Sequence, residues 1–246
     1  MKLKFLLLQA RNPGDAAQPH ELAAFRDALN LPGITIEPYD LLQGRPPRSL
    51  IEAHDCVLVG GSGDFGMGDA KDHAWLREFI DLCGDLASDG SPMFASCFGY
   101  QALVVAGGGR VETDKSRAEV GTFSIELTEA GHEDPLFGPL APGFPAQFGH
   151  KDHALDVPAG MTNLARSERC PHQALRVEGK PIYATQFHPE LSMEQNRERF
   201  LNYLEGYSQP DMVDTPEQVL ARYVPTLEAT SLLEAYARKV LGYSEE

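Results

Sequence analysis

The chain has 246 residues and a formal net charge of −15 at pH 7, because 36 acidic residues outnumber 21 Lys and Arg residues. This length can bury a full hydrophobic core, either as one α/β domain or as one domain with a small appendage. The negative charge argues against a general nucleic-acid-binding protein, since phosphate backbones require a cationic surface. We attribute the acidity to solubility.

The N-terminus and the cysteines indicate a protein of a reducing compartment. Residues 1–9 begin with lysines, as a signal peptide does, but their apolar run is much shorter than the roughly 7–15 residues of a signal core. No stretch reaches the ~20 apolar residues of a membrane-spanning helix. The four cysteines show no CxxC spacing, so we expect neither a zinc site nor a disulfide framework. We expect a cytoplasmic location, where cysteines stay reduced.

The N-terminal part of the chain alternates between strand-like and helix-like segments. Short apolar runs predict strands at residues 3–9, 34–38, 56–59 and 92–96, and helical spacing predicts helices at 20–29, at 71–86 and directly after residue 97. Continuous apolar runs are typical of strands buried on both faces of a parallel sheet. We therefore expect a doubly wound, mostly parallel α/β fold of the flavodoxin-like kind, with its site at the carboxyl ends of the strands.

The remainder of the chain predicts a small antiparallel extension followed by helices. Strand-like runs separated by Gly, Pro and Asp lie at residues 123–127, 173–177 and 182–187. Ser192 and Gln195 form a capping box at the start of a helix, and Thr215-Pro216 starts another. We expect a main domain over residues 1–208 and a C-terminal helical extension over 209–246, whose last helix docks on the domain or on a partner.

Cys97 lies where a predicted strand turns into a predicted helix. Such a turn can hold its central residue in a strained conformation at the edge of the sheet, and the small residues Ala95 and Gly99 relieve crowding there. The positive end of the helix favours a thiolate. A buried apolar cysteine is the commoner meaning of Cys in such a run, and it suits Cys56 and Cys83. A buried apolar cysteine does not explain the turn-making Gly that follows Cys97. We therefore interpret Cys97 as a nucleophile.

His188-Pro189-Glu190 supplies a base and a group to orient it. Pro189 disfavours the helical conformation for His188 and holds it extended. Residues two apart in an extended chain project to the same side, so His188 and Glu190 can lie side by side. A surface loop is the plain alternative for this tripeptide taken alone. Together with Cys97, it predicts a Cys–His–Glu triad.

A glycine-rich segment, Gly60-Gly61-Ser62-Gly63, directly follows the strand expected at 56–59. Its backbone N–H groups, aided by the N–H of Phe98, can stabilise a developing oxyanion. An ordinary strand-to-loop turn is the plainer alternative. A nucleotide-binding loop is disfavoured because the Lys-Ser/Thr pair of such loops is missing.

His150, Asp152 and His153 lie close enough in sequence to suggest a metal site. No further ligand has a suitable spacing, so we interpret them as a solvated loop that borders the cleft, and we predict no metal and no cofactor. Cys170 is interpreted as a loop thiol without a base beside it.

With these segments in place, the chain resembles the class I, or triad-type, glutamine amidotransferases, in particular the stand-alone GMP-synthase-like domains, over residues 3–206. Three motifs carry the resemblance: the strand end at Gly60-Gly61, the turn at residues 95–101, and Gln186-Phe187-His188-Pro189-Glu190. Residues 119–121 and 150–152 also sit where the family has similar residues. Two positions depart from the family pattern, which usually has Gly at Ala95 and commonly His at Tyr100.

The resemblance implies hydrolysis of the γ-amide of glutamine through a thioester on Cys97. His188 would then move the protons, and Glu190 would orient His188. The resemblance also implies an oxyanion hole formed by the N–H groups of Gly61 and Phe98. It places substrate binding at Gln101, with Gly60 and Tyr100 in the pocket wall.

The resemblance leaves the role of the chain open, because the sequence contains no synthetase module to receive ammonia. One interpretation is an amidotransferase subunit that passes ammonia to a separate synthetase or acceptor subunit. A second is an independent hydrolase of γ-glutamyl peptides or amides with the same triad. A third is a non-catalytic binding or regulatory domain, against which the intact triad counts. In the first two interpretations the partner of the site is a small molecule, and we expect no nucleic acid and no membrane.

Overall fold

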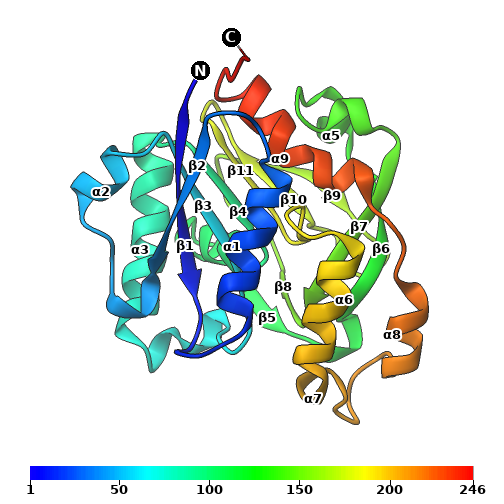
Figure 1. Ribbon diagram of the computed structural model, residues 1–246. Coiled ribbons are helices and arrows are strands. Elements are labelled where there is room, and N and C mark those ends of the chain that lie inside the picture. The colour runs from blue at the N-terminus through cyan, green and yellow to red at the C-terminus, as the bar shows by residue number, and fades with distance from the viewer. Residues whose placement is uncertain (246) are drawn as a thin grey trace.

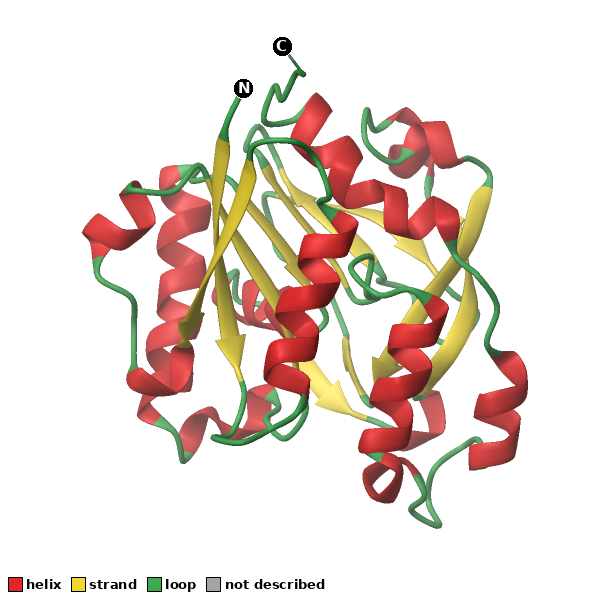
Figure 2. Ribbon diagram, viewed as in Figure 1, coloured by secondary structure: helices red, strands yellow, loops and turns green. Residues whose placement is uncertain are grey.

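A single large sheet organises the molecule. In the computed structural model, which describes residues 1–245, nine strands form this sheet in the order β2-β1-β3-β4-β11-β10-β9-β6-β7 (Figures 1 and 2). Its strands are β1 Leu3–Ala10, β2 Ile34–Asp40, β3 Cys56–Ser62, β4 Met93–Ser96, β6 Glu119–Leu127, β7 Gly143–His150, β9 Met161–Arg166, β10 Ala174–Val177 and β11 Ile182–Thr185. A separate two-stranded sheet pairs β5 Val111–Thr113 with β8 Asp152–Ala154. The helices are α1 Ala17–Ala28, α2 Arg48–Glu52, α3 Ala74–Asp89, α4 Phe98–Ala106, α5 Glu129–Glu133, α6 Met193–Asn202, α7 Leu204–Tyr207, α8 Pro216–Arg222 and α9 Leu227–Lys239.

The half of the sheet from β2 to β11 is parallel, and its inner strands β1, β3, β4 and β11 are buried on both faces, whereas the edge strand β2 is partly exposed. Burial between parallel neighbours was predicted for β1, β3 and β4, but the segment of β11 was expected in the antiparallel extension. Along β1, Phe5 and Leu7 belong to a core cluster shared with α1 and α9, whereas Leu6 and Leu8 belong to a second cluster shared with α3 and α4. This division follows from the alternation of side chains along a strand. The doubly wound α/β fold is therefore confirmed, and the carboxyl ends of these strands share one edge.

The other half of the sheet, from β10 to β7, is antiparallel. Two of its strands, β7 and β9, were not predicted from the sequence. Gly143, Pro145 and Gly149 interrupt the pattern of β7, although this strand pairs with β6 over eight residues. Pairing with neighbours far along the chain stabilises β7 in spite of its poor intrinsic preference for strand.

The C-terminal helix α9 docks on this domain. Leu232, Leu233 and Tyr236 are fully buried and belong to the core cluster on the α1 face of the sheet. The Tyr236 hydroxyl also donates a hydrogen bond to the carbonyl of Pro181, at 2.7 Å. The capping boxes of Ser192 with Gln195 and of Thr215 with Gln218 start α6 and α8. The division of the chain at residue 208 stays a prediction.

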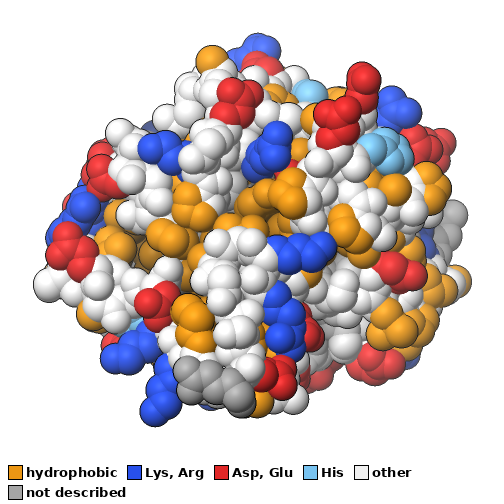
Figure 3. Space-filling view, turned by 90° about the horizontal axis from the view of Figure 1, so that it is seen from above, with side chains coloured by type: hydrophobic (Ala, Val, Ile, Leu, Met, Phe, Trp, Pro, Cys, Tyr) orange, Lys and Arg blue, Asp and Glu red, His pale blue; other side chains and the backbone are white. Residues whose placement is uncertain are grey.

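The two termini lie at the same end of the molecule, where the Met1 amino group donates to the carbonyl of Ser244 at 3.1 Å. Figure 3 looks onto this end and shows acidic, basic and hydrophobic side chains intermixed. The acidic excess therefore does not gather into one continuous face there. Among residues 1–245, no helix combines the length and the apolar character that crossing a membrane requires.

Candidate active site

Cys97 occupies a sharp turn between β4 and α4. Its backbone adopts φ 48° and ψ −97°, a positive φ that side chains rarely tolerate. The Cys97 N–H donates to the carbonyl of Thr185 in β11, at 2.7 Å, which anchors the turn to the neighbouring strand. A Cβ at Gly99 would lie 2.6 Å from the Val59 side chain, so only Gly fits at that position. The strained turn expected from the sequence is present.

His188 and Glu190 follow the end of β11 at the same edge of the sheet. Because β4 and β11 are parallel and Ser96 pairs with Thr185, the residues after both strands emerge together. The His188 Nδ1 lies 2.6 Å from Glu190 Oε1, and both side chains are buried. An ionised carboxylate only accepts hydrogen bonds, so the imidazole proton belongs on Nδ1 and the Nε2 of the neutral ring keeps its lone pair.

Burial sets the resting charges of these three side chains. It raises the pKa of the Cys97 thiol to about 12, and the Glu190 charge adds to this effect. Burial also lowers the pKa of His188, although Glu190 acts in the opposite direction. For Glu190, burial alone would raise the pKa, but the neighbouring His188 outweighs it and the net shift is downward. The resting state is therefore a neutral thiol, a neutral imidazole and an ionised carboxylate.

A cavity of about 230 Å³ opens beside Cys97. Phe98 and Gln101 of α4 form part of its wall, which also contains charged side chains of both signs. The charged residues in the wall are Asp64, Asp69, Asp152 and Lys151. A volume of this size suits one small polar molecule lying against the Cys97 side chain.

Gly60 and Gly61 lie close to this centre, but one predicted role of Gly61 is not met in the structure. A Cβ at Gly61 would lie 3.0 Å from His188 Cε1, and a Cβ at Gly60 would overlap the carboxylate of Glu21. The Gly61 N–H donates to Glu21 Oε1 at 3.1 Å, so it already has an acceptor and is not free for an oxyanion. Glu21 is held in turn by Arg11, at 2.8 Å, in a fully buried ion pair.

Gln101 and Tyr100 differ in where they point. The Gln101 Nε2 donates to the carbonyl of Asp152 and to Gln186 Oε1, each at 3.2 Å, at the wall of the cavity. Tyr100 is completely buried, and its hydroxyl donates to the carbonyl of His172 at 3.0 Å. The prediction that Tyr100 shapes the pocket wall is therefore wrong, because its side chain is enclosed in the core beneath α4 and does not line the cavity.

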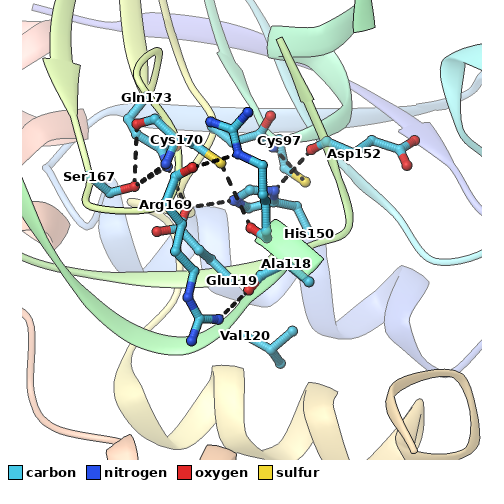
Figure 4. A network of polar contacts seen from close by, with 12 residues as sticks. Cys97, Ala118, Glu119, Val120, His150, Asp152, Ser167, Arg169, Cys170 and Gln173 are labelled. Carbon is cyan, nitrogen blue, oxygen red and sulfur yellow. Dashed lines mark hydrogen bonds and ion pairs between the residues drawn. The ribbon is translucent and has the colours of Figure 1, made fainter. Parts of the chain in front are cut away.

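Of the residues assigned to a solvated loop, His150 and His153 are instead buried, whereas Asp152 is partly exposed. His150 and Asp152 border the cavity, as expected. His150 ends β7 and His153 lies in β8, and the thiol of Cys170 is also inside. The His150 Nε2 lies 3.1 Å from Glu119 Oε2, and its Nδ1 donates to the carbonyl of Asp152 at 2.9 Å (Figure 4). These histidines are buried because β7 pairs with β6 and β8 pairs with β5, contacts between segments far apart along the chain.

This cluster contains a possible set of metal ligands. The ligand atoms of Glu119, His150 and Cys170 lie within 4.8 Å of one another, a combination of carboxylate, imidazole and thiol that zinc can accept. The carboxylate is already bonded to His150 and Gln173, and burial raises the pKa of Cys170 to about 12. The cluster is thus held together by its own hydrogen bonds with the thiol protonated.

Sequence reasoning missed several residues next to the site. Arg11, Glu21 and Arg199 are buried charges beside Gly61, and nothing in the sequence distinguishes them from surface charges. Gln186 was noticed only as part of the motif around His188, yet its Nε2 lies 3.5 Å from Cys97 Sγ. Its position directly before a predicted catalytic segment was the available signal.

The strain at Cys97 predicts a difference between two variants. Cys97→Gly and Cys97→Ala both remove the sulfur, but only Ala keeps a Cβ in the positive-φ conformation. Strain of this kind costs roughly 1–3 kcal/mol. We therefore expect Cys97→Gly to be more stable than Cys97→Ala, with a free energy of unfolding about 1 kcal/mol larger. Urea denaturation at one pH measures the difference. A more stable Ala variant would mean that the turn is not strained.

Comparison with known proteins agrees with this geometry. A profile of the family described as Glutamine amidotransferase class-I matches residues 33–204. The chain is 35% identical over 126 residues to a glutamine-hydrolyzing GMP synthase subunit from Methanosarcina barkeri, covering 50% of this chain and 65% of that protein. It is 39% identical over 104 residues to the glutamine-hydrolyzing GMP synthase of Thermosipho melanesiensis, covering 42% of this chain and 19% of that enzyme. The matches thus span about two thirds of the first relative and about a fifth of the second.

The fold has relatives among solved structures. The crystal structure of a glutamine amidotransferase from Thermotoga maritima superposes with a TM-score of 0.77 at 18% identity, covering 99% of this chain and 100% of that one. The family profile covers most of the chain, including the Cys97 turn and the segment around His188. This protein belongs to the class I glutamine amidotransferase family.

Proposed function

We propose that this chain hydrolyses the γ-amide of glutamine, with Cys97 as nucleophile, His188 as proton carrier and Glu190 as the group that orients His188. The observation that carries the proposal is the pairing of β4 with β11, which brings the strained Cys97 turn to the same sheet edge as the buried His188–Glu190 pair. Nucleophile, base and orienting carboxylate are the parts that thiol catalysis requires.

The proposed reaction proceeds in two halves. Cys97 Sγ gives its proton to His188 Nε2 and attacks the amide carbon of glutamine, which leaves a negative charge on the amide oxygen. Collapse of this intermediate breaks the C–N bond, and the proton on His188 passes to the nitrogen, so that ammonia leaves and a γ-glutamyl thioester remains. Water then gives a proton to His188 and attacks the thioester. Glutamate leaves, and the proton returns to the sulfur.

The proposed oxyanion hole begins at the N–H of Phe98. This residue is the first of α4, where N–H groups lack acceptors within the helix and the helix dipole is positive. The Gly61 N–H joins the hole only when it exchanges Glu21 for the substrate oxygen. Two donors of this kind stabilise the intermediate by several kcal/mol, on the order of 3 each.

The charges of the cavity suit the free end of an amino acid. Asp64, Asp69 and Asp152 offer acceptors for the α-ammonium group, and Lys151 offers a charge for the α-carboxylate. Within the same proposal, Gln101 completes the substrate pocket, and Gly60 contributes only indirectly, because its missing side chain leaves room for the Glu21 carboxylate. An independent γ-glutamyl peptide or amide hydrolase remains the second candidate, because a cavity of about 230 Å³ that is open to solvent also admits a larger leaving group.

The destination of the ammonia is also a proposal. Two relatives are named as glutamine-hydrolyzing subunits of GMP synthase, and a third is named as GMP synthase itself. We propose that this chain passes ammonia to a separate synthetase subunit, in a cytoplasmic setting that keeps the Cys97 thiol reduced.

Removal of the thiol tests the proposed nucleophile. We expect Cys97→Ala to reduce the release of glutamate from glutamine by at least about a thousandfold, because Cys97 is the one cysteine of the described residues that lines the cavity. Cys83→Ala is the matched control, since Cys83 is buried in α3, does not line the cavity, and should keep its activity. Glutamate is measured enzymatically with glutamine and with γ-glutamyl peptides as alternative substrates. Full turnover by Cys97→Ala would refute the mechanism, and preference for peptides would favour the second candidate.

The protonation of His188 predicts the pH dependence. The base must be neutral, and burial lowers its pKa from the ordinary value of 6.5, so activity is lost only as pH falls through a value below 6.5. In Glu190→Gln the carboxylate that raises this pKa is gone, so the remaining activity should fall off at a still lower pH. Profiles of kcat/KM against pH measure the acid limb of each protein. A wild-type limb above pH 6.5, or an upward shift in the variant, would contradict this assignment.

A further inference from the structure

The buried sulfur of Cys97 has a hydrogen-bond donor that the triad does not include. The Gln186 Nε2 lies 3.5 Å from Cys97 Sγ, and Gln186 is fully buried immediately after the end of β11. Its backbone N–H is fixed to the carbonyl of Gln173 at 2.8 Å. The amide is therefore held against the sulfur by the same strand that presents His188.

The direction of this hydrogen bond follows from its neighbours. The backbone carbonyl of Asp152 can only accept, so Gln101 must present its NH₂ group to it, at 3.2 Å. The same Gln101 nitrogen donates its second hydrogen to Gln186 Oε1, at 3.2 Å. Gln186 is then left with its NH₂ group facing the sulfur. If the Gln101 amide were reversed, its oxygen would face the Asp152 carbonyl oxygen. If the Gln186 amide alone were reversed, its NH₂ group would face the NH₂ group of Gln101.

The starting point of this series is itself fixed. The Asp152 carbonyl also accepts from His150 Nδ1, at 2.9 Å, and His150 is anchored by Glu119 on its other nitrogen (Figure 4). The imidazole of His150 is therefore held at both of its nitrogens. The orientation of the Gln186 amide is therefore set by the Asp152 carbonyl, which the buried His150 ring holds in place, rather than by a mobile side chain.

We propose that Gln186 donates a hydrogen bond to the Cys97 sulfur and stabilises the thiolate, and that Gln101 is a positioning residue which fixes the direction of that donor. A donor favours the ionised acceptor over the neutral one, and it does so strongly where water is excluded. Because burial disfavours the Cys97 thiolate, this donor offsets part of that cost when the proton moves to His188. The inference rests on the proposed function only in taking Cys97 as the nucleophile.

The test measures the thiol rather than glutamine turnover. Alkylation of Cys97 by iodoacetamide is followed against pH in the full chain, with mass spectrometry of the Cys97 peptide and Cys97→Ala as the blank. Gln186→Met has a similar volume and no donor, so we expect the apparent pKa of Cys97 to rise by about one unit and alkylation below that pKa to slow about tenfold. Gln101→Met should act in the same direction. Gln186→Glu should raise the pKa further, because it places an acceptor and a charge at the sulfur.

Gln147→Met is the matched control. Gln147 is also a fully buried glutamine with side-chain hydrogen bonds, to the Val224 carbonyl at 2.9 Å and from Asn196 at 3.0 Å, but its side chain does not bond to Cys97, Gln186 or Gln101. The Cys97 of this variant should alkylate as in the wild type. Equal profiles for Gln186→Met, Gln147→Met and the wild type would overturn the inference. A shifted profile in a protein that does not hydrolyse glutamine would keep the inference and refute the proposed substrate, and an active enzyme with an unshifted profile would do the reverse.

Discussion

The pairing of β4 with β11 is the constraint on which the site depends. These strands lie far apart along the chain, and their parallel register, with Ser96 opposite Thr185, makes them neighbours. One hydrogen bond, from the Cys97 N–H to the Thr185 carbonyl, ties the strained turn to the strand that leads to Gln186 and His188. A slip of one residue would turn these side chains to the other face of the sheet. Both strands are completely buried, so the packing of helices on their two faces holds the register.

The electrostatics of the site follow from this burial. Burial makes charge costly, so the resting thiol and imidazole are neutral, and in the proposed mechanism the chemistry begins when a proton moves between them. In the proposed mechanism two groups of donors stabilise the charged state, because the first turn of α4 faces the cavity and the Gln186 amide faces the sulfur. Such preorganised groups need little rearrangement when charge develops, which is the usual source of electrostatic catalysis. Gly61 is the exception, since its N–H is engaged by Glu21.

Much of this arrangement could be predicted from the sequence, and the remainder depends on contacts between distant residues. The strand-to-helix turn at Cys97 has a local cause in small neighbours, and the capping boxes have fixed spacings, so both were predicted. Strand β7, with its Pro and Gly, owes its structure to pairing with β6. The burial of Tyr100, the ion pair of Arg11 with Glu21 and the direction of the Gln186 amide are likewise set by residues far along the chain.

The proposed mechanism requires Cys97 to form a covalent bond with the γ-glutamyl group during turnover. The most direct measurement is the mass of the protein after rapid acid quenching in the presence of glutamine, followed by peptide mapping. We expect one glutamyl group attached to Cys97, which disappears when the glutamine is consumed. Continued release of glutamate without any adduct, or with an adduct on another residue, would contradict it.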